Sequence, residues 1–231
     1  MLGTRVSTVD PRAVADAVGA VRDRILRVAG ARPIELIAVT KGFGADAIQA
    51  AIDAGCTSVG ENYAQELRAK MTAMPAGTAM PQIHFIGHLQ TNKVKVVAEY
   101  VSIWHTVDRA ALADEIARRS PRATVFVQVN TTAEATKGGC IPAESAALVA
   151  HCRSVDLSVV GLMTIGPTTP DPALAHSAFA LLARIADDLG LASRSMGMSD
   201  DLEIALEHGA THVRIGSALF GERPQRRAQM R

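Results

Sequence analysis

Aromatic residues and cysteines are scarce in this sequence. Aromatic side chains make up 3% of its 231 residues, and its three cysteines, Cys56, Cys140 and Cys152, lie far apart with no CxxC pair. An odd number of separated cysteines argues against a disulfide framework, so we expect a protein of the reducing cytoplasm. His84 and His88 are four residues apart but flank a strand end and a glycine, which does not favour a zinc site.

Neither sign of charge is in excess, and long apolar runs are absent. Lysine and arginine total 24 against 23 acidic residues, which gives a formal net charge of +1. This balance leaves no electrostatic footprint for nucleic acid or for an anionic membrane surface. The N-terminus has no signal-peptide apolar core, and no later stretch is long enough to span a bilayer. We therefore expect a soluble protein that binds neither nucleic acid nor membrane.

Short β-branched runs alternate with alanine-rich helical patterns along the chain. An opening helix is predicted over residues 10–29, where Pro11 follows the capping Asp10 and apolar residues recur at helical spacing. Eight strand-and-helix units are predicted between about residue 34 and residue 223. Their strands are IELIAVT, TSVG, IHFIG, VSIWHTV, TVFVQVN, SVVGLMTI, SRSMG and THVRIGS, and their helices cover 45–54, 62–71, 90–99, 109–119, 142–151, 172–188, 199–208 and a short segment from Ala218.

The alternation of strands and helices predicts a parallel sheet. Eight such units, in a chain close to the roughly 250 residues typical of the fold, favour a closed (β/α)8 TIM barrel. A doubly wound open sheet is the alternative. Because 48% of the residues are hydrophobic and no linker or low-complexity tract interrupts the pattern, residues 1–231 are expected to form a single domain.

Lys41 ends the apolar run IELIAVTK. A lysine at the end of a buried strand is held in place and partly dehydrated, and burial of this kind lowers the pKa of an amine and suits it to Schiff-base formation. A solvated lysine just past a strand is the commoner alternative. The residues at the other strand ends favour the chemical interpretation.

Those strand ends are unusually polar. In a barrel the carboxyl ends of the strands form one mouth, where the chemistry takes place. Side chains from most of the eight predicted strands are therefore expected to converge there. They are Lys41, Glu61, Asn62, His105, Asn130, Met163, Thr164, Ser195, Arg214, Gly216 and Ser217.

The last two units carry a possible phosphate site. In SMGMSDD, Ser199 precedes two acids and is predicted to cap the following helix. Loops after the seventh and eighth strands of barrels commonly bind phosphate through backbone N–H groups and a short extra helix. In RIGSALFG, Gly216 allows close backbone approach and Ser217 offers a hydroxyl, while Asp200 and Asp201 are expected to point outward.

A lysine beside a phosphate site on a barrel has two interpretations from the residues alone. One is a Schiff-base aldolase acting on sugar phosphates, and the other is a pyridoxal phosphate site. The two features are neighbours around a closed barrel in either case. Residue chemistry leaves both open.

Several longer motifs then narrow the choice. AVTK, GENYAQE, IHFIGHLQTNK, TKGG, GLMTIG, SMGMSDD and VRIGSALFGER occur in that order between about residue 30 and residue 223. In this order they resemble the YggS/PROSC family of pyridoxal phosphate-binding proteins. The resemblance implies the barrel fold of the alanine racemase N-terminal domain, without the racemase's second, β-rich domain.

The resemblance also implies roles at the two ends of the cofactor ring. Lys41 would form a Schiff base with the aldehyde of pyridoxal 5'-phosphate. Asn62 would lie near the ring hydroxyl, and Arg214 would approach the pyridine nitrogen. No metal is implied.

The phosphate is implied to bind Ser199, Gly216 and Ser217. Two departures from the family pattern do not touch the implied ligands. Residues 42–44 read Gly-Phe-Gly where relatives often carry a proline, which bears on the shape of the loop after the lysine. Arg194 occupies a position where relatives usually have leucine.

An arginine at the ring nitrogen favours a binding protein over an enzyme. Arginine can only donate a hydrogen bond there, so the nitrogen stays unprotonated and the cofactor is a weaker electron sink. A racemase would also need well-placed acid and base groups, one of which comes from parts that this chain lacks. Tyr63 and Tyr100 are its only tyrosines, and Tyr63 is expected to pack.

We therefore predict a carrier that holds pyridoxal 5'-phosphate as a lysine Schiff base, without catalytic residues. It would serve intracellular vitamin B6 and amino-acid homeostasis as a monomer, with pyridoxal phosphate-dependent apoenzymes as candidate recipients. The alternatives are a racemase-like enzyme using the same cofactor and, as a third class, the Schiff-base aldolase.

Overall fold

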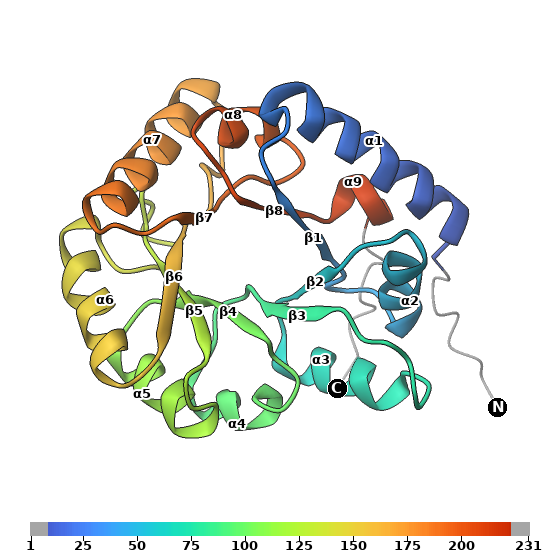
Figure 1. Cartoon of the computed structure of the whole chain (residues 1–231), viewed down its shortest axis with the longest axis horizontal. Helices are drawn as coiled ribbons and strands as arrows, with labels where there is room; N and C mark the ends of the chain where they lie inside the picture. The colour runs from blue at the N-terminus through green and yellow to red at the C-terminus, as the bar shows by residue number, and fades with distance from the viewer. Residues whose placement is uncertain (1–8, 223–231) are drawn as a thin grey trace, which may run out of the picture.

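Eight parallel strands form a closed barrel in the computed structural model, which describes residues 9–222 (Figure 1). Each strand pairs with the next along the chain, from β1 to β8. The barrel closes because β8 also pairs with β1, with Leu36 opposite Val213. The predicted (β/α)8 barrel is confirmed, and the open-sheet alternative is wrong.

The helices form a ring outside the strands (Figure 1). The strands are β1 (Glu35–Val39), β2 (Ser58–Glu61), β3 (Gln82–Phe85), β4 (Ile103–Val107), β5 (Thr124–Gln128), β6 (Ser158–Met163), β7 (Ser193–Ser195) and β8 (His212–Ile215). The α-helices are α1 (Pro11–Ala29), α2 (Ala45–Asp53), α3 (Ala64–Ala73), α4 (Val94–Val97), α5 (Ala110–Arg119), α6 (Ser145–Ser154), α7 (Pro172–Asp188), α8 (Leu202–Glu207) and α9 (Ser217–Phe220), with 3-10 turns η1 (Thr91–Lys93) and η2 (Pro142–Glu144).

The opening helix α1 begins as the sequence predicts. The Asp10 side chain accepts a hydrogen bond from the backbone N–H of Arg12, and Pro11 is the first helical residue. Its apolar stripe packs against α2, α8 and α9, so α1 covers the outside of the seam between β8 and β1 (Figure 1). The buried residues of the stripe are Val14, Val18, Val21, Ile25 and Ala29.

Most helix predictions differ from the structure only at their ends. The helix predicted over 172–188 has those bounds in α7. The one predicted over 90–99 is shorter and starts as the 3-10 turn η1 before α4, and η2 likewise precedes α6. Tight 3-10 turns are frequent at helix N-termini, and apolar periodicity does not distinguish them from the first α-helical turn.

The single-domain prediction for residues 1–231 includes both ends of the chain. Residues 1–8 and 223–231 lie outside the described residues, so this stays a prediction. None of the helices in the described part of the chain combines the length and apolar composition that a membrane span needs.

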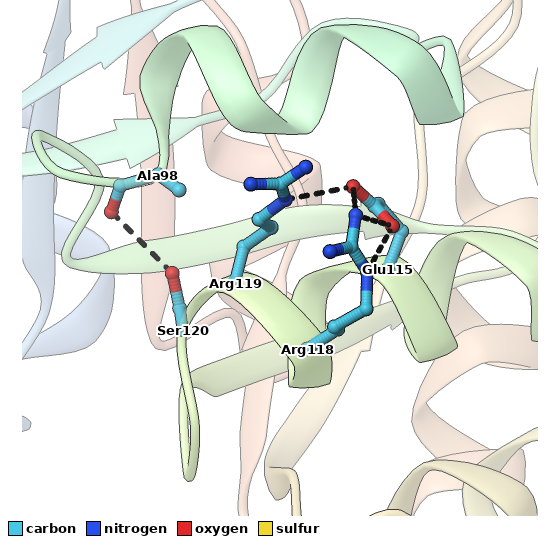
Figure 2. A network of polar contacts seen from close by, with 5 residues as sticks. All are labelled: Ala98, Glu115, Arg118, Arg119 and Ser120. Carbon is cyan, nitrogen blue, oxygen red and sulfur yellow. Dashed lines mark hydrogen bonds and ion pairs between the residues drawn. The ribbon is translucent and has the colours of Figure 1, made fainter.

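Charged residues stabilise the outer surface of the helix ring, as α5 illustrates (Figure 2). Arg118 and Arg119 both donate hydrogen bonds to Glu115 one turn earlier, and these bonds lower the pKa of that carboxyl group. The hydroxyl of Ser120, just after the helix, donates to the carbonyl of Ala98 at 3.4 Å. Such exposed ion pairs each contribute little to the free energy of unfolding, because solvent screens them.

Rings from four strands pack inside the barrel. The imidazole of His105 stacks on Phe126 with ring centroids 4.3 Å apart, and it lies 5.0 Å from His84. His212 contacts Phe126 edge-on at 5.0 Å. Barrel interiors are usually filled by branched aliphatic side chains. In a chain with few aromatic residues, imidazoles therefore fill part of the interior and introduce polar atoms into it.

Candidate functional site

A cavity of about 230 Å³ opens at the carboxyl ends of the strands. Two other cavities, of about 420 Å³ against α1 and the start of β1 and of about 400 Å³ beside the 165–172 loop, do not gather the predicted site residues. All six of those residues line the first cavity. They are Lys41, Asn62, Ser199, Arg214, Gly216 and Ser217.

Lys41 lies in the turn after β1 rather than in the strand itself. The strand ends at Val39, and the half-buried lysine follows two residues later. Gly42 next to it has a φ of 83°, a conformation that favours glycine and turns the chain toward α2. The strand is shorter than predicted because its hydrogen-bonded ladder ends where the chain turns.

A buried ion pair holds the chain before Lys41. The side chain of Lys70 is 3% exposed, and its ammonium group lies 2.7 Å from the carbonyl oxygen of Thr40 and 2.6 Å from Oε1 of Glu61. The Thr40 hydroxyl donates to the same carboxylate oxygen at 2.5 Å. Burial raises the pKa of Glu61, and the charge of Lys70 opposes that rise.

The chain after Lys41 is held by the same cluster. Glu66 lies 2.8 Å from the ammonium group of Lys70 and accepts the backbone N–H of Gly42 at 2.6 Å. Hydrogen bonds thus fix the backbone on both sides of Lys41. The sequence analysis did not assign Glu66 and Lys70 a role, although their (i, i+4) spacing was a signal for an ion pair on one helical face.

Asn62 follows β2 and lines the cavity. Its Oδ1 atom is buried and has no hydrogen-bond partner among the described residues. Gly87 packs directly against the backbone of Asn62, because a Cβ at position 87 would come within 2.2 Å of the Asn62 carbonyl oxygen. This close approach fixes the backbone from which the Asn62 side chain extends.

Arg214 on β8 forms the floor of the cavity. It is 5% exposed and donates from Nη1 to the hydroxyl of Ser195 at 2.7 Å and from Nη2 to the carbonyl of Thr164 at 2.8 Å. Burial lowers its pKa to about 10, and the charge of Asp201 opposes that shift. The guanidinium is therefore still a cation at neutral pH and favours an electron-rich ligand.

Two serine hydroxyls meet at the other side of the cavity. Ser199 Oγ accepts from the Ser217 hydroxyl at 3.1 Å and lies 3.3 Å from the backbone nitrogen of Ala218, in the first turn of α9. The prediction that Ser199 caps the following helix is wrong, because α8 begins only at Leu202. The hydroxyl is directed at α9 instead, beside Gly216, which precedes that helix.

The predicted outward orientation is wrong for Asp201, which accepts the backbone N–H of Met198 at 2.6 Å and lies with its carboxylate against Gly166. Asp200 is exposed, as predicted, although it also lines the cavity. The chain turns at Gly197, whose φ is 97°, and the late start of α8 leaves both acids in that turn.

Not every polar strand end reaches the cavity. The Asn130 amide donates to the carbonyl of Glu134 at 3.0 Å and closes its own loop. His105 and Ser195 are fully buried below the cavity. Tyr63 is 51% exposed at the start of α3 instead of packed. Among residues 9–222 no cluster of three histidine, cysteine, aspartate or glutamate side chains could hold a metal ion.

The Gly-Phe-Gly departure after the lysine has a structural role. Phe43 is buried, and its ring centroid lies 5.5 Å from that of Phe220 in α9. This contact joins the loop that carries Lys41 to the helix that follows Ser217. The other departure, Arg194, pairs with Asp187 and does not line the cavity.

Residues 16–224 match the family model described as alanine racemase, N-terminal domain. The pyridoxal phosphate homeostasis protein of Pseudomonas aeruginosa is 40% identical over 225 residues, covering 91% of this chain and 96% of that protein. The chain belongs to the pyridoxal phosphate homeostasis protein family. The family resemblance inferred from the motifs is thus confirmed, and the bovine member is 39% identical, covering 90% of this chain and 86% of that protein.

Solved structures of PipY, a protein of Synechococcus elongatus, have the same fold. PipY of Synechococcus elongatus without pyridoxal phosphate superposes with a TM-score of 0.81 at 31% identity. PipY with pyridoxal phosphate bound gives a TM-score of 0.77 at 29% identity, and each comparison covers 90% of this chain and 100% of PipY. Alanine racemase from Bacillus anthracis, at 18% identity and a TM-score of 0.71, shows the fold alone.

Proposed function

We propose that this protein binds pyridoxal 5'-phosphate and serves intracellular pyridoxal phosphate and amino-acid homeostasis. The observation that carries the proposal is one cavity that brings together a lysine, the side chain of Asn62, the guanidinium of Arg214 and a pair of serine hydroxyls. Its relatives named as pyridoxal phosphate homeostasis proteins, and PipY with pyridoxal phosphate bound, support it.

The residues present match the polar groups around the cofactor ring. When bound, pyridoxal phosphate supplies an aldehyde that reacts reversibly with a lysine amine to give a Schiff base. Lys41 is the lysine that lines the cavity, and its neighbours are held by the Glu61 and Lys70 pair. Asn62 would lie near the ring hydroxyl, and Arg214 would donate to the ring nitrogen.

The phosphate would bind the serine pair. Ser199 and Ser217 offer hydroxyls, and the backbone after Gly216 offers the first N–H groups of α9. The cation of Arg214 lines the same cavity and adds to the attraction for a dianion. The negative charge of Asp200 opposes the binding of this dianion, so the hydroxyl and N–H donors would give the site its specificity for phosphate.

The carrier role is favoured over catalysis by Arg214. A guanidinium donates but does not accept, so it stabilises an unprotonated ring nitrogen and weakens electron withdrawal by the ring. Tyr63, 51% exposed, is not enclosed in the cavity as an acid or base would be. The proposed protein therefore holds and releases its cofactor without turning over an amino acid.

The proposed carrier role also implies a recipient protein for the cofactor and a cellular location. We propose a cytoplasmic monomer that passes its cofactor to pyridoxal phosphate-dependent apoenzymes. All three cysteines are free thiols, as suits a reducing compartment.

Titration of the purified protein with pyridoxal phosphate tests the proposal. A visible absorption band should grow to one equivalent, bleach on borohydride treatment, and leave a reduced label on Lys41 by peptide mass mapping. Lys41→Ala should abolish the band, whereas the control Lys137→Ala, beside the 165–172 loop, should keep it. A label on Lys137 or saturable binding without any band would overturn the assignment of Lys41.

Turnover is tested separately on the loaded protein. α-Deuterium exchange into a panel of free amino acids should be absent or marginal. Exchange at about 1 per second or faster would identify a racemase-like enzyme and overturn the carrier role.

A further inference from the structure

A line of hydrogen bonds runs downward from Arg214 into the barrel. Arg214 Nη1 donates to Ser195 Oγ at 2.7 Å, and that hydroxyl lies 2.9 Å from Nδ1 of His105. Nε2 of His105 lies 2.8 Å from Nδ1 of His84. Ser195, His105 and His84 are each fully buried, so these contacts are made without water around them.

The line continues to the opposite end of the barrel. His84 Nε2 lies 3.1 Å from the hydroxyl of Ser58, the first residue of β2. Ser58 in turn donates to Oε1 of Glu35, the first residue of β1, at 2.5 Å. The same carboxylate oxygen also accepts the hydroxyl of Thr57 at 2.9 Å. Five hydrogen bonds therefore join a guanidinium at the cavity to a carboxylate at the far end of the barrel.

The lower end of this line fixes the direction of its hydrogen bonds. A carboxylate can only accept, so the single proton of Ser58 points at Glu35. His84 Nε2 must then carry the proton of its bond to Ser58, which leaves Nδ1 as an acceptor. His105 must consequently donate from Nε2 and accept at Nδ1.

The upper end is consistent with the same direction. A guanidinium can only donate, so Ser195 accepts from Arg214 and its own proton is available to another acceptor. Nδ1 of His105 lies within reach of that proton. Every donor then faces an acceptor when both imidazoles are neutral and protonated at Nε2. Protonation of His84 at Nδ1 would place two donors face to face, because Nε2 of His105 already donates to that atom.

The surroundings favour the neutral rings. Burial lowers the pKa of His84 to about 4 and that of His105 well below its usual value. His212 and Arg214 on β8 act in the same direction, whereas Glu35 on β1 raises the pKa of His84. Burial also lowers the pKa of His212, so this third imidazole beside the line is neutral too.

We propose that Ser195 is a positioning residue for Arg214, and that His105, His84, Ser58 and Glu35 form a directed relay that keeps Ser195 an acceptor. The relay orients the guanidinium so that its remaining N–H groups face the ring nitrogen of the cofactor. The inference rests on the proposed function for its effect on the cofactor, but the direction of the relay is a property of the protein alone.

The direction is tested on the protein without cofactor. Long-range ¹H–¹⁵N correlation spectra should show both His84 and His105 as neutral rings protonated at Nε2, with no change between about pH 7 and pH 5.5. A ring protonated at Nδ1, or a charged ring in this range, would overturn the relay whether or not pyridoxal phosphate binds.

The positioning role is tested with Ser195→Ala. Pyridoxal phosphate should bind about tenfold more weakly, because one hydrogen bond that orients a charged group is lost. The absorption band of the bound cofactor should also shift, since its ring nitrogen meets a misoriented donor. Ser195→Thr, which keeps the hydroxyl, should restore the band position.

Ser145→Ala is the matched control. Ser145 is also a buried serine with a hydrogen-bonded hydroxyl, on α6 outside the barrel. The affinity of Ser145→Ala for pyridoxal phosphate and the position of its absorption band should equal those of wild type. If Ser195→Ala binds with wild-type affinity and an unshifted band, the positioning role is wrong although the protein still binds its cofactor. If wild type itself does not bind, the proposed function fails and the spectra of the histidines still decide the relay.

Discussion

Three residues of the cavity complement one another at the scale of single side chains. Asn62 contributes a side-chain amide, Arg214 presents donors, and Ser199 presents a hydroxyl beside an N–H group. A pyridine ring with a hydroxyl, a nitrogen and a phosphate needs these groups at different edges. The order of polar groups around the cavity therefore constrains the orientation of the ring as well as its identity.

The serine pair gives a prediction at this scale. Ser199→Ala and Ser217→Ala should each weaken pyridoxal phosphate binding by about one to two powers of ten, since a hydrogen bond to a charged group contributes roughly 1.5–3 kcal/mol. Pyridoxal, which lacks the phosphate, should bind wild type and both variants equally. Ser199→Ala removes no cap from α8, which begins at Leu202, but it does remove the acceptor of the Ala218 N–H in α9, so the comparison with pyridoxal separates this structural effect from the loss of phosphate binding. Titration of both cofactor forms measures this, and an equal loss for pyridoxal would assign the serines to the fold.

At the scale of helices, two ion pairs with similar sequence spacing should differ greatly in their contribution to the free energy of unfolding. Glu66 and Lys70 on α3 are four residues apart, and the ammonium group of Lys70 pairs with both Glu66 and the fully buried Glu61. Lys70→Met leaves these carboxylates without their cation and should lower the free energy of unfolding by about 3–5 kcal/mol. Arg118→Met on α5 removes an exposed pair and should lower it by about 0.5 kcal/mol or less. Urea denaturation measures both.

A double variant separates charge from packing on α3. Glu61→Gln combined with Lys70→Met removes the main buried charge left behind and should recover part of the loss. Equal stability of the double and the single variant would indicate that Lys70 acts through packing alone. Loss of cofactor binding in a folded Glu66→Gln variant would support the role of Glu66 at Gly42.

The sequence predicts elements better than it predicts the contacts at their ends. Apolar periodicity located every strand of the barrel and the bounds of α7, because burial on one face is a local property. The start of α8 was missed because Ser199 bonds to α9, a contact between segments that local capping rules cannot show. Asn130 was expected in the cavity but closes its own loop. The line of hydrogen bonds from Arg214 to Glu35 could not be predicted either, since its six residues come from six different strands.

For the whole molecule, the relay links the two ends of the barrel. Residues at the carboxyl ends of barrel strands usually serve function, and those at the opposite end usually serve stability. Here Glu35 and Ser58 begin their strands, yet they are joined to Arg214 through the histidines. Stability and the geometry of the cavity therefore depend on the same neutral imidazoles.

This dependence predicts a fall in stability at mildly acidic pH. The unfolded chain takes up a proton at His84 near its ordinary pKa of about 6.5, whereas the folded chain does so only near a pKa of about 4. The unfolded state thus binds more protons in this window, so stability decreases as pH falls through it. For His84 alone the free energy of unfolding should drop by about 2 kcal/mol between pH 7 and pH 5. His105 and His212 add to the drop, because their pKa values are also lowered.

His208 shares this sign, because burial and His176 lower its pKa too, but the acidic groups with shifted pKa values do not mimic the signature. Glu61, whose pKa is raised by burial, has the opposite sign, because its protonation favours the folded state as pH falls. Glu134, with a pKa lowered to about 2, loses its contribution only below its ordinary pKa of about 4.5. Denaturant titrations at closely spaced pH values give the slope directly. The exposed His88→Gln control should keep the wild-type slope, and His84→Gln should flatten it. A wild-type stability that is constant or rises from pH 7 to pH 5 would mean that the barrel interior accepts charge, which the directed relay does not allow.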